Sequence, residues 1–387
     1  MRAWIVALAL LAAATSSRAA DNTDSLIARI KAVSDKGQGH KDAVAATAEL
    51  SRCSPEKLPA ILVAMNDAGP LARNWLRGAF ETAATRSLQT PATFPKVALL
   101  GFFNDHNNNP AIRRLAFEWI TKVDAGFAAK TIPESLADPS SEMRRDAVAF
   151  HIDRAKELAA KGDKDAAKAE WELALTGAGE EDQLKLISKT LKEDYSEDVD
   201  LIRHNGLIVD WHVIGPFDNK KMKGFDVAYP PEKEVDFSKT YPAEFEGMTN
   251  DLKWVRLKGE NPDGKFEIAK LTSPYKGAIS YAAHEFTSDS ARPVEFRFAT
   301  PNAWKLWLNG ELLFGREEYH RGMFYDMYQV RGQLKPGKNT ILMKVCQNEQ
   351  KDDWAQDWTI QFRVCDLTGR ALKPTGSTAS AGQPQVD

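Results

Sequence analysis

Polar and aromatic side chains are densest in one segment of the second half of the chain, residues 315–326. A pyranose ring has an apolar face that stacks on flat side chains and hydroxyl groups that need fixed hydrogen-bonding partners. This segment offers both kinds of group, so it is the first candidate for a ligand-binding loop. With one tryptophan from the next polar segment, the candidate ligand-binding residues are Arg316, Glu318, Tyr319, His320, Arg321, Tyr325, Asp326 and Trp354. The alternative is a solvated loop whose charges pair with one another.

The next polar segment, residues 347–354, is rich in carboxylates and amides and could face the same rim. Oxygen atoms of these groups are the ligands that calcium prefers. The candidate calcium ligands are Asn348, Glu349, Asp352 and Asp353. Their spacing differs from that of the known calcium loop, so a structural calcium ion is one use of the segment and solvent exposure is the other. No other cofactor is expected.

Known catalytic arrangements are missing from the sequence. Glu317 and Glu318 are neighbours, and neighbours in a strand point apart, so they make a poor acid–base pair for glycoside hydrolysis. The seven histidines lack zinc-ligand spacing, and no Gly-x-Ser-x-Gly segment occurs. We therefore expect a binding protein rather than an enzyme, with a glycoside hydrolase as the remote alternative.

The three cysteines allow one disulfide bond. Cys346 and Cys365 end two strand-like runs of the same module, so in an exported protein they could pair, leaving Cys53 as a lone thiol. The bond requires their Cα atoms to lie within about 7 Å of each other. The alternative is that both thiols are free.

The first residues have the features of a signal peptide. Arg2 precedes a short apolar run, and Ser17-Arg-Ala19 fits the small-x-small cleavage rule, which predicts a signal peptide over 1–19. We expect export to a bacterial periplasm or the extracellular space. No later stretch approaches the roughly 20 apolar residues that a membrane span needs. The net charge of −3 gives no positive excess for nucleic-acid binding.

The elements that must position these residues change type near residue 204. Residues 20–203 have helical periodicity, as at Leu58, Ile61, Leu62 and Met65. Residues 204–371 alternate apolar and polar side chains as strands do, with a type I′ hairpin turn at Asn309-Gly310 and another turn at Lys335-Pro-Gly337. Residues 372–387 have a polar composition without period and are expected to be disordered.

Three helix starts in the first half resemble one another. Arg73, Arg113 and Arg144 each fall in the first turn of a predicted helix, at intervals that suit stacked helix pairs. The pattern resembles a short, degenerate HEAT-type array, and residues 155–175 resemble a tetratricopeptide-type hairpin. A solenoid of this kind would offer an extended surface to a protein partner. The alternative is a generic helical domain.

The second half carries three segments of a familiar order. They are Trp-x-x-x-Gly-Pro-Phe at 211–217, Leu-Trp-Leu-Asn-Gly at 306–310, and Leu-x-x-Gly-x-Asn at 334–339. From about 206 to 369 the chain resembles the galactose-binding-domain-like jelly roll, which serves as the sugar-binding module of many β-galactosidases. The resemblance implies an antiparallel β-sandwich that binds ligands through loops, without hydrolase activity.

The sequence therefore predicts an exported α plus β protein, with an α-helical repeat domain followed by an antiparallel β-sandwich. We expect a non-catalytic carbohydrate-binding protein whose helical repeats contact a protein partner. The alternative is a structural adaptor of the cell envelope that binds an envelope protein and no sugar.

Overall fold

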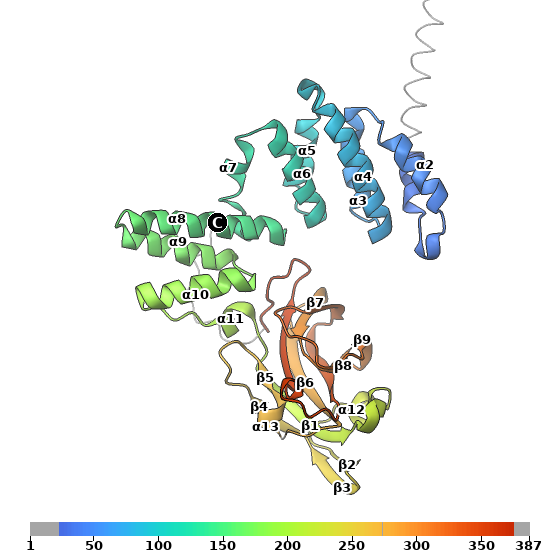
Figure 1. The fold of residues 1–387 in the computed structure, drawn as a ribbon, viewed down its shortest axis with the longest axis vertical. Coiled ribbons are helices and arrows are strands. Elements are labelled where there is room, and N and C mark those ends of the chain that lie inside the picture. Colours follow the sequence, from blue (N-terminus) through green and yellow to red (C-terminus); the bar gives the residue numbers. More distant parts are fainter. Residues whose placement is uncertain (1–22, 273, 375–387) are drawn as a thin grey trace, which may run out of the picture. The chain divides into compact units, whose positions relative to one another are not determined.

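The computed structural model describes residues 23–272 and 274–374 of the 387-residue chain. It contains two units, of which the first ends at Ala178 and the second begins at Gly179 (Figure 1). Helices form the first unit and antiparallel sheets dominate the second, which confirms the predicted α plus β class. The predicted signal peptide and the tail from Thr375 onward lie outside the described residues. Within the described residues, no helix has the length and apolar character needed to cross a membrane.

The first unit is built from helices joined by short turns. Residues 23–31 are helical, and the following helices are α2 (His40–Leu50), α3 (Leu58–Met65), α4 (Pro70–Ser87), α5 (Lys96–Asn104), α6 (Pro110–Val123), α7 (Phe127–Thr131), α8 (Ser141–Ala160) and α9 (Lys164–Gly177). Pro70 and Pro110 begin their helices, where a missing N–H costs no hydrogen bond. The apolar positions that predicted α3, Leu58, Ile61, Leu62 and Met65, are all fully buried.

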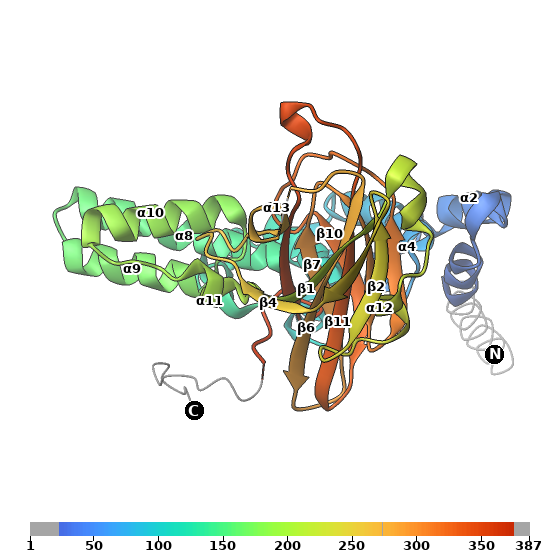
Figure 2. The same ribbon diagram turned by 90° about the horizontal axis from the view of Figure 1, so that it is seen from below.

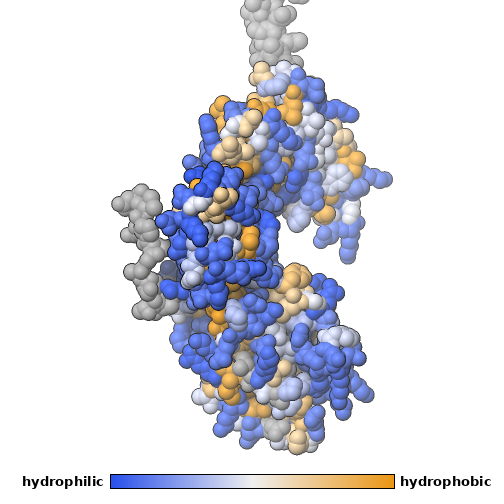
Figure 3. Space-filling view, turned by 60° about the vertical axis from the view of Figure 1, so that its left-hand side comes forward, coloured by the Kyte–Doolittle hydropathy of each residue, from blue (hydrophilic) through white to orange (hydrophobic). Residues whose placement is uncertain are grey.

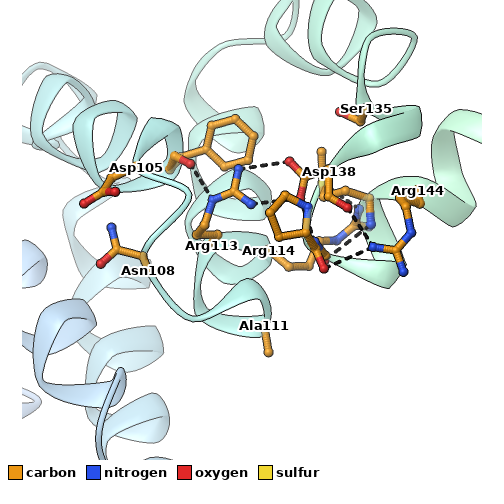
Figure 4. Close-up of polar contacts among 12 residues, drawn as sticks. Asp105, Asn108, Ala111, Arg113, Arg114, Ser135, Asp138 and Arg144 are labelled. Atoms are coloured by element: carbon orange, nitrogen blue, oxygen red, sulfur yellow. Dashed lines mark hydrogen bonds and ion pairs between the residues drawn. The ribbon is translucent and has the colours of Figure 1, made fainter. Parts of the chain in front are cut away.

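The three first-turn arginines have one structural role in common. Each guanidinium donates hydrogen bonds to backbone carbonyls of the segment that precedes its helix, for example Arg73 Nε to Met65 O (3.1 Å) and Arg113 Nε to Phe103 O (2.6 Å). Arg113 also forms a two-bond ion pair with Asp138, and Arg144 Nη1 donates to Asp138 O at 2.7 Å (Figure 4). Carbonyls at helix ends lack partners within the helix, so these arginines satisfy them.

The second unit begins with two helices and continues as a sandwich of two sheets. The helices are α10 (Glu181–Tyr195) and α11 (Leu201–Asn205), with the short α12 (Pro230–Lys233) and α13 (Ile268–Leu271) between strands. The strands are β1 (Asp210–Asp218), β2 (Thr240–Phe245), β3 (Met248–Lys253), β4 (Val255–Lys258), β5 (Phe266–Glu267), β6 (Ala278–Ser288), β7 (Arg292–Ala299), β8 (Ala303–Leu308), β9 (Glu311–Arg316), β10 (Tyr328–Leu334), β11 (Gly337–Gln347) and β12 (Thr359–Cys365).

The strands form a six-stranded sheet, a four-stranded sheet and a separate hairpin. The six-stranded sheet has the order β4-β1-β6-β11-β8-β9, the four-stranded sheet the order β10-β7-β12-β5, and β2 pairs with β3. Figure 2 shows β1, β6 and β11 of the larger sheet side by side, as their registers require. The hairpin turn predicted at Asn309-Gly310 is confirmed, since both residues have positive φ (53° and 86°).

Two apolar clusters lie on opposite faces of the six-stranded sheet. The cluster between the sheets includes Trp304, while the cluster on the outer face includes Trp307. The spacing of these two tryptophans predicts opposite faces, with one of them free to be exposed. Both are buried instead, because residues from the 225–254 segment cover the outer face.

In the view of Figure 3, most of the visible surface is hydrophilic, with apolar residues scattered among the polar ones.

Three sequence predictions about this unit need correction. The unit begins at Gly179 rather than near residue 204, because α10 and α11 belong to it. The first residues of the predicted disordered tail are bound to β12, since Leu372 N–H donates to Val364 O at 2.8 Å. Cys346 and Cys365 are free thiols in different sheets, so the predicted disulfide is wrong. Burial raises the pKa of Cys346 to about 12 and that of Cys365 to about 11.

Candidate functional site

The candidate site lies at one end of the sandwich, where several chain connections meet. The register places the end of β1 beside the start of β6 (Phe217 opposite Ile279) and the end of β11 beside the start of β8 (Cys346 opposite Ala303). The end of β9 lies beside the start of β8 as well. The connections that leave these strand ends, residues 219–227, 274–277, 317–327 and 348–357, therefore share one end of the molecule's second unit.

Asn219 is the buried residue that joins these connections. Its Nδ2 donates to Tyr319 Oη (3.2 Å) and to Gln347 O (3.0 Å), and its Oδ1 accepts from Gly224 N–H (3.1 Å). Its own N–H donates to Gly277 O at 2.8 Å. The side chain is fully buried, its Nδ2 donates two hydrogen bonds and its Oδ1 accepts one. One asparagine thus ties four segments into a single loop cluster.

We define the recognition rim as Tyr319, His320, Asn348 and Trp354 of this cluster. Trp354 is exposed, and the other three residues are half-buried. Asn348 Oδ1 accepts from Gln350 N–H (3.0 Å) and lies 2.6 Å from His320 Nε2. Because that oxygen only accepts, His320 donates through Nε2, and this fixes the orientation of its ring. The rings of Trp354 and His320 are perpendicular, with centroids 5.5 Å apart. The structure therefore brings the two polar segments together, as the sequence analysis expects.

Trp354 presents an accessible flat face. Its side chain is 64% exposed, although most tryptophans of the second unit are buried. Phe324, in the same connection as His320, is 60% exposed. Fixed polar groups and exposed rings occur together here, which is the combination that a sugar surface requires.

Backbone strain is concentrated in the same loops. His320 (φ 55°), Lys221 (φ 58°) and Met222 (φ 60°) all adopt left-handed conformations without being glycine. Such residues cost on the order of 1–3 kcal/mol each and persist where surrounding contacts hold them. Lys221 N–H donates to Glu349 Oε2 at 2.9 Å, and this contact links its loop to the segment of Trp354.

The charged residues of the 315–326 segment form loose surface pairs beside the rim. Glu318 lies 3.6 Å from both Arg316 and Arg321, and each arginine side chain is at least half exposed. Arg321 also donates its backbone N–H to Pro301 O at 3.0 Å, which anchors the loop. Exposed pairs of this kind contribute little stability, so these side chains are free to reorient toward a ligand.

Tyr325 and Asp326, predicted as ligand-binding residues, belong to a different group of contacts. Asp326 forms ion pairs with Arg363 of β12 and with Arg297 of β7 (3.4 Å). Both arginines alternate with core residues of the four-stranded sheet, so they project from its outer face. Tyr325 lies 4.9 Å from the Arg363 guanidinium, and burial raises its pKa. These two residues hold the loop to the sheet rather than face the rim.

The four predicted calcium ligands do not converge on one point. Asn348 Oδ1 is occupied by His320 and Gln350, Glu349 accepts from Lys221 N–H, and Asp352 accepts from Gln350 Nε2 (3.0 Å). The described residues contain no group of three or more histidine, cysteine, aspartate or glutamate side chains placed to hold a metal. The calcium prediction is therefore corrected, because local hydrogen bonds use these oxygens instead.

A second polar cluster, on the outer face of the six-stranded sheet, escaped the sequence analysis. Lys344 is fully buried, and its Nζ donates to Phe225 O (2.9 Å), Val227 O (2.8 Å) and Glu232 Oε1 (2.9 Å). Tyr281 donates to the same carboxylate. Burial lowers the pKa of Lys344. All three ammonium hydrogens have acceptors, so the cluster fixes the 225–232 segment and leaves no free nucleophile.

Sequence reasoning missed Asn219 and Lys344 for one reason. Each is a polar residue whose partners include a backbone carbonyl more than 100 residues away in the sequence, and such partners leave no periodic pattern. The sequence offers one clue to Asn219, because this residue directly follows the last residue of β1.

No family model matches the chain, and no curated protein matches it. Among solved structures, a β-glucuronidase from an uncultured Clostridium species is 13% identical (TM-score 0.25) over 41% of this chain and 29% of that one. A β-glucosidase from Kluyveromyces marxianus, in complex with glucose, is 11% identical (TM-score 0.21) over 40% and 16%. A GH31 α-xylosidase from Xanthomonas citri is 12% identical (TM-score 0.17) over 29% and 15%. The chain spans less than a third of each enzyme, and likeness this low is no evidence for a shared fold or activity.

Proposed function

We propose that the recognition rim binds carbohydrate without catalysis. The observation that carries the proposal is Trp354, which is 64% exposed and in perpendicular ring contact with a histidine that is itself fixed by Asn348. A ring that is both exposed and oriented loses little freedom when a sugar stacks on it. The neighbouring arginine and carboxylate side chains supply donors and acceptors for sugar hydroxyls.

The rim is open, so binding is expected to be weak. Dissociation constants of roughly micromolar to millimolar correspond to about −8 to −4 kcal/mol.

A glycan array identifies the preferred sugar, and calorimetric titration of that sugar then compares two variants. Trp354→Ala is expected to weaken binding at least about tenfold, because it removes the stacking face. Phe150→Ala, an exposed aromatic of α8, is the control and leaves affinity unchanged. An array without any bound glycan contradicts the proposal.

The alternative function, an adaptor that binds a protein, has support of its own in the first unit. A groove of about 450 Å³ lies between α2 and α4 and is lined by Val44, Ala48, Trp75 and Gly78 among others. Val44 is 43% exposed at this groove. A stable partner that co-purifies from the native host and is lost on Val44→Asp, but kept on Val63→Asp, favours the adaptor. Sugar binding without such a partner favours the glycan-binding function.

We further propose that the protein is exported, on the strength of the signal-peptide features of residues 1–19. The mature chain then begins near Ala20. Mass spectrometry of the N-terminal peptide, from protein expressed with its own first residues, tests this. An intact Met1 on cell-associated protein contradicts export.

A further inference from the structure

The free edge of β9 is a second surface, and the recognition rim takes no part in it. β9 is the last strand of the six-stranded sheet and pairs only with β8 among the described strands. Its residues Leu312 (50% exposed) and Phe314 (56% exposed) are large and apolar. An edge strand has unpaired backbone groups, and natural proteins usually place charges there to prevent association. In β9, by contrast, the residues between Glu311 and Arg316 are apolar or glycine.

The local geometry places apolar groups on both faces of this edge. Phe314 lies opposite Leu306, whose side chain faces the core between the sheets, and Leu312 lies opposite Trp307, whose side chain faces the outer cluster. Leu313 is the extra residue of a bulge between them and packs against the inner core. A bulge shortens the stretch that another strand can pair with. The edge therefore suits a short pairing of a few residues.

The charges at the two ends of β9 identify the partner. The strand reads Glu-Leu-Leu-Phe-Gly-Arg, with Glu311 at its start and Arg316 at its end. When two copies pair antiparallel about the point between Leu313 and Phe314, Glu311 of each copy faces Arg316 of the other. Opposite charges across strands stabilise a pair, and here the contact occurs twice by symmetry. Arg316 is half exposed and only loosely paired with Glu318, at 3.6 Å, so it is able to reach.

We propose that β9 pairs with β9 of a second copy, which joins the two six-stranded sheets into one continuous sheet across a two-fold axis. The self-complementary order of acidic, apolar and basic residues carries this inference. The β9 edge shares Arg316 with the candidate ligand-binding residues, whereas the recognition rim and Glu311 belong to one surface each, so Glu311→Arg tests the dimer without changing the proposed glycan site. Since the pairing is short, the dimer is expected to be weak and to form only as protein concentration rises.

Sedimentation velocity of the full mature chain over a concentration series tests the proposal. The wild type is expected to move from monomer to dimer with increasing concentration. Glu311→Arg and Arg316→Glu each place like charges opposite one another and are expected to weaken dimerisation about tenfold or more. The double variant with both changes restores the opposite-charge contact and is expected to recover most of the dimer. Lys258→Glu, on the opposite edge strand β4, is the matched control and leaves the dimer intact.

The remaining outcomes overturn the proposal. A wild type that stays monomeric at every concentration shows that the edge does not self-associate. A dimer that neither single reversal weakens uses another surface. Loss of the dimer in both single variants without recovery in the double variant contradicts the antiparallel register. Circular dichroism and thermal melting of each variant separate loss of association from loss of folding.

Discussion

At the scale of single residues, Asn219 connects the candidate site to the fold. It hydrogen-bonds to Tyr319 and to Gln347, which lie 100 and 128 residues further along the chain, and His320 beside Tyr319 contacts the ring of Trp354. Buried amides with every partner present fix a conformation, and the loss of one leaves its partners without hydrogen bonds. The order of the rim therefore depends on a side chain that is fully buried beneath it.

We predict that Asn219→Ala loosens the rim more than it unfolds the protein. The substitution leaves Tyr319 Oη, Gln347 O and Gly224 N–H without this partner, which costs about 2–3 kcal/mol of unfolding free energy. Hydrogen exchange is expected to rise in residues 220–224, 317–322 and 347–350. Asn339→Ala is the matched control, because Asn339 is equally buried but holds the turn at Lys335. Equal exchange changes at the rim in both variants contradict a specific role for Asn219.

A second residue-scale prediction concerns His284. Burial lowers the pKa of this histidine, and this effect outweighs the contact of its Nδ1 with Asp210 O (2.9 Å), which raises the pKa. The folded protein therefore resists protonating this histidine, whereas the unfolded chain protonates it below about pH 6.5. The unfolded state then binds more protons, so the stabilising contribution is present above that pH and is lost as the pH falls. Thermal melting between pH 7 and pH 5 is expected to show a smaller decrease for His284→Asn than for the wild type. The control His106→Gln, in an exposed loop, keeps the wild-type slope, and an unchanged slope in His284→Asn contradicts this assignment.

At the scale of elements, periodicity predicted most of what the structure contains. The helical spacing in α3 and the alternation in β7 follow from burial on one face, which any sequence with that fold must satisfy. The hairpin at Asn309-Gly310 follows from the positive φ that its turn requires. The layer formed by β2, β3 and the 225–232 segment was not predicted, because the contacts of the buried Lys344 with the carbonyls of Phe225 and Val227 leave no pattern in the sequence.

The arginines of the first unit give an element-scale prediction about stability. Arg113 is fully buried and paired with Asp138, so Arg113→Ala leaves a buried carboxylate without its partner. We expect a loss of about 3–5 kcal/mol of unfolding free energy, measured by urea denaturation. Arg77→Ala removes an exposed pair with Glu81 and is expected to change stability by less than about 0.5 kcal/mol. Similar losses in both variants contradict the structural role of the Arg113–Asp138 pair.

At the scale of the whole molecule, the sequence predicted two units of the right kinds but not their boundary. The periodicity of α10 is helical, so it was assigned to the first unit. The structure places α10 and α11 in the second, where Leu184 and Leu201 line a small pocket with Tyr325. Periodicity reports which face of a helix is buried and not which neighbour buries it.

The candidate site was predicted in part, for a similar reason. Composition identified the two loops that meet at His320 and Asn348. It could not separate Trp354, which is exposed, from Tyr325 and Asp326, which the arginines of β7 and β12 hold against the sheet. These arginines lie far from the loop in sequence, so only the folded chain distinguishes the two groups.

We propose that sugars stack on Trp354, and the indole N–H signal of this residue reports such binding. ¹⁵N-labelled protein is titrated with galactose, glucose and N-acetylglucosamine oligosaccharides, and the Trp354 resonance is assigned by its absence from Trp354→Phe. We expect at least one of these sugars to shift this indole resonance, while the resonances of the buried tryptophans, such as Trp211 and Trp304, stay in place. A Trp354 signal that none of the sugars moves, or shifts confined to other indoles, contradicts the proposal.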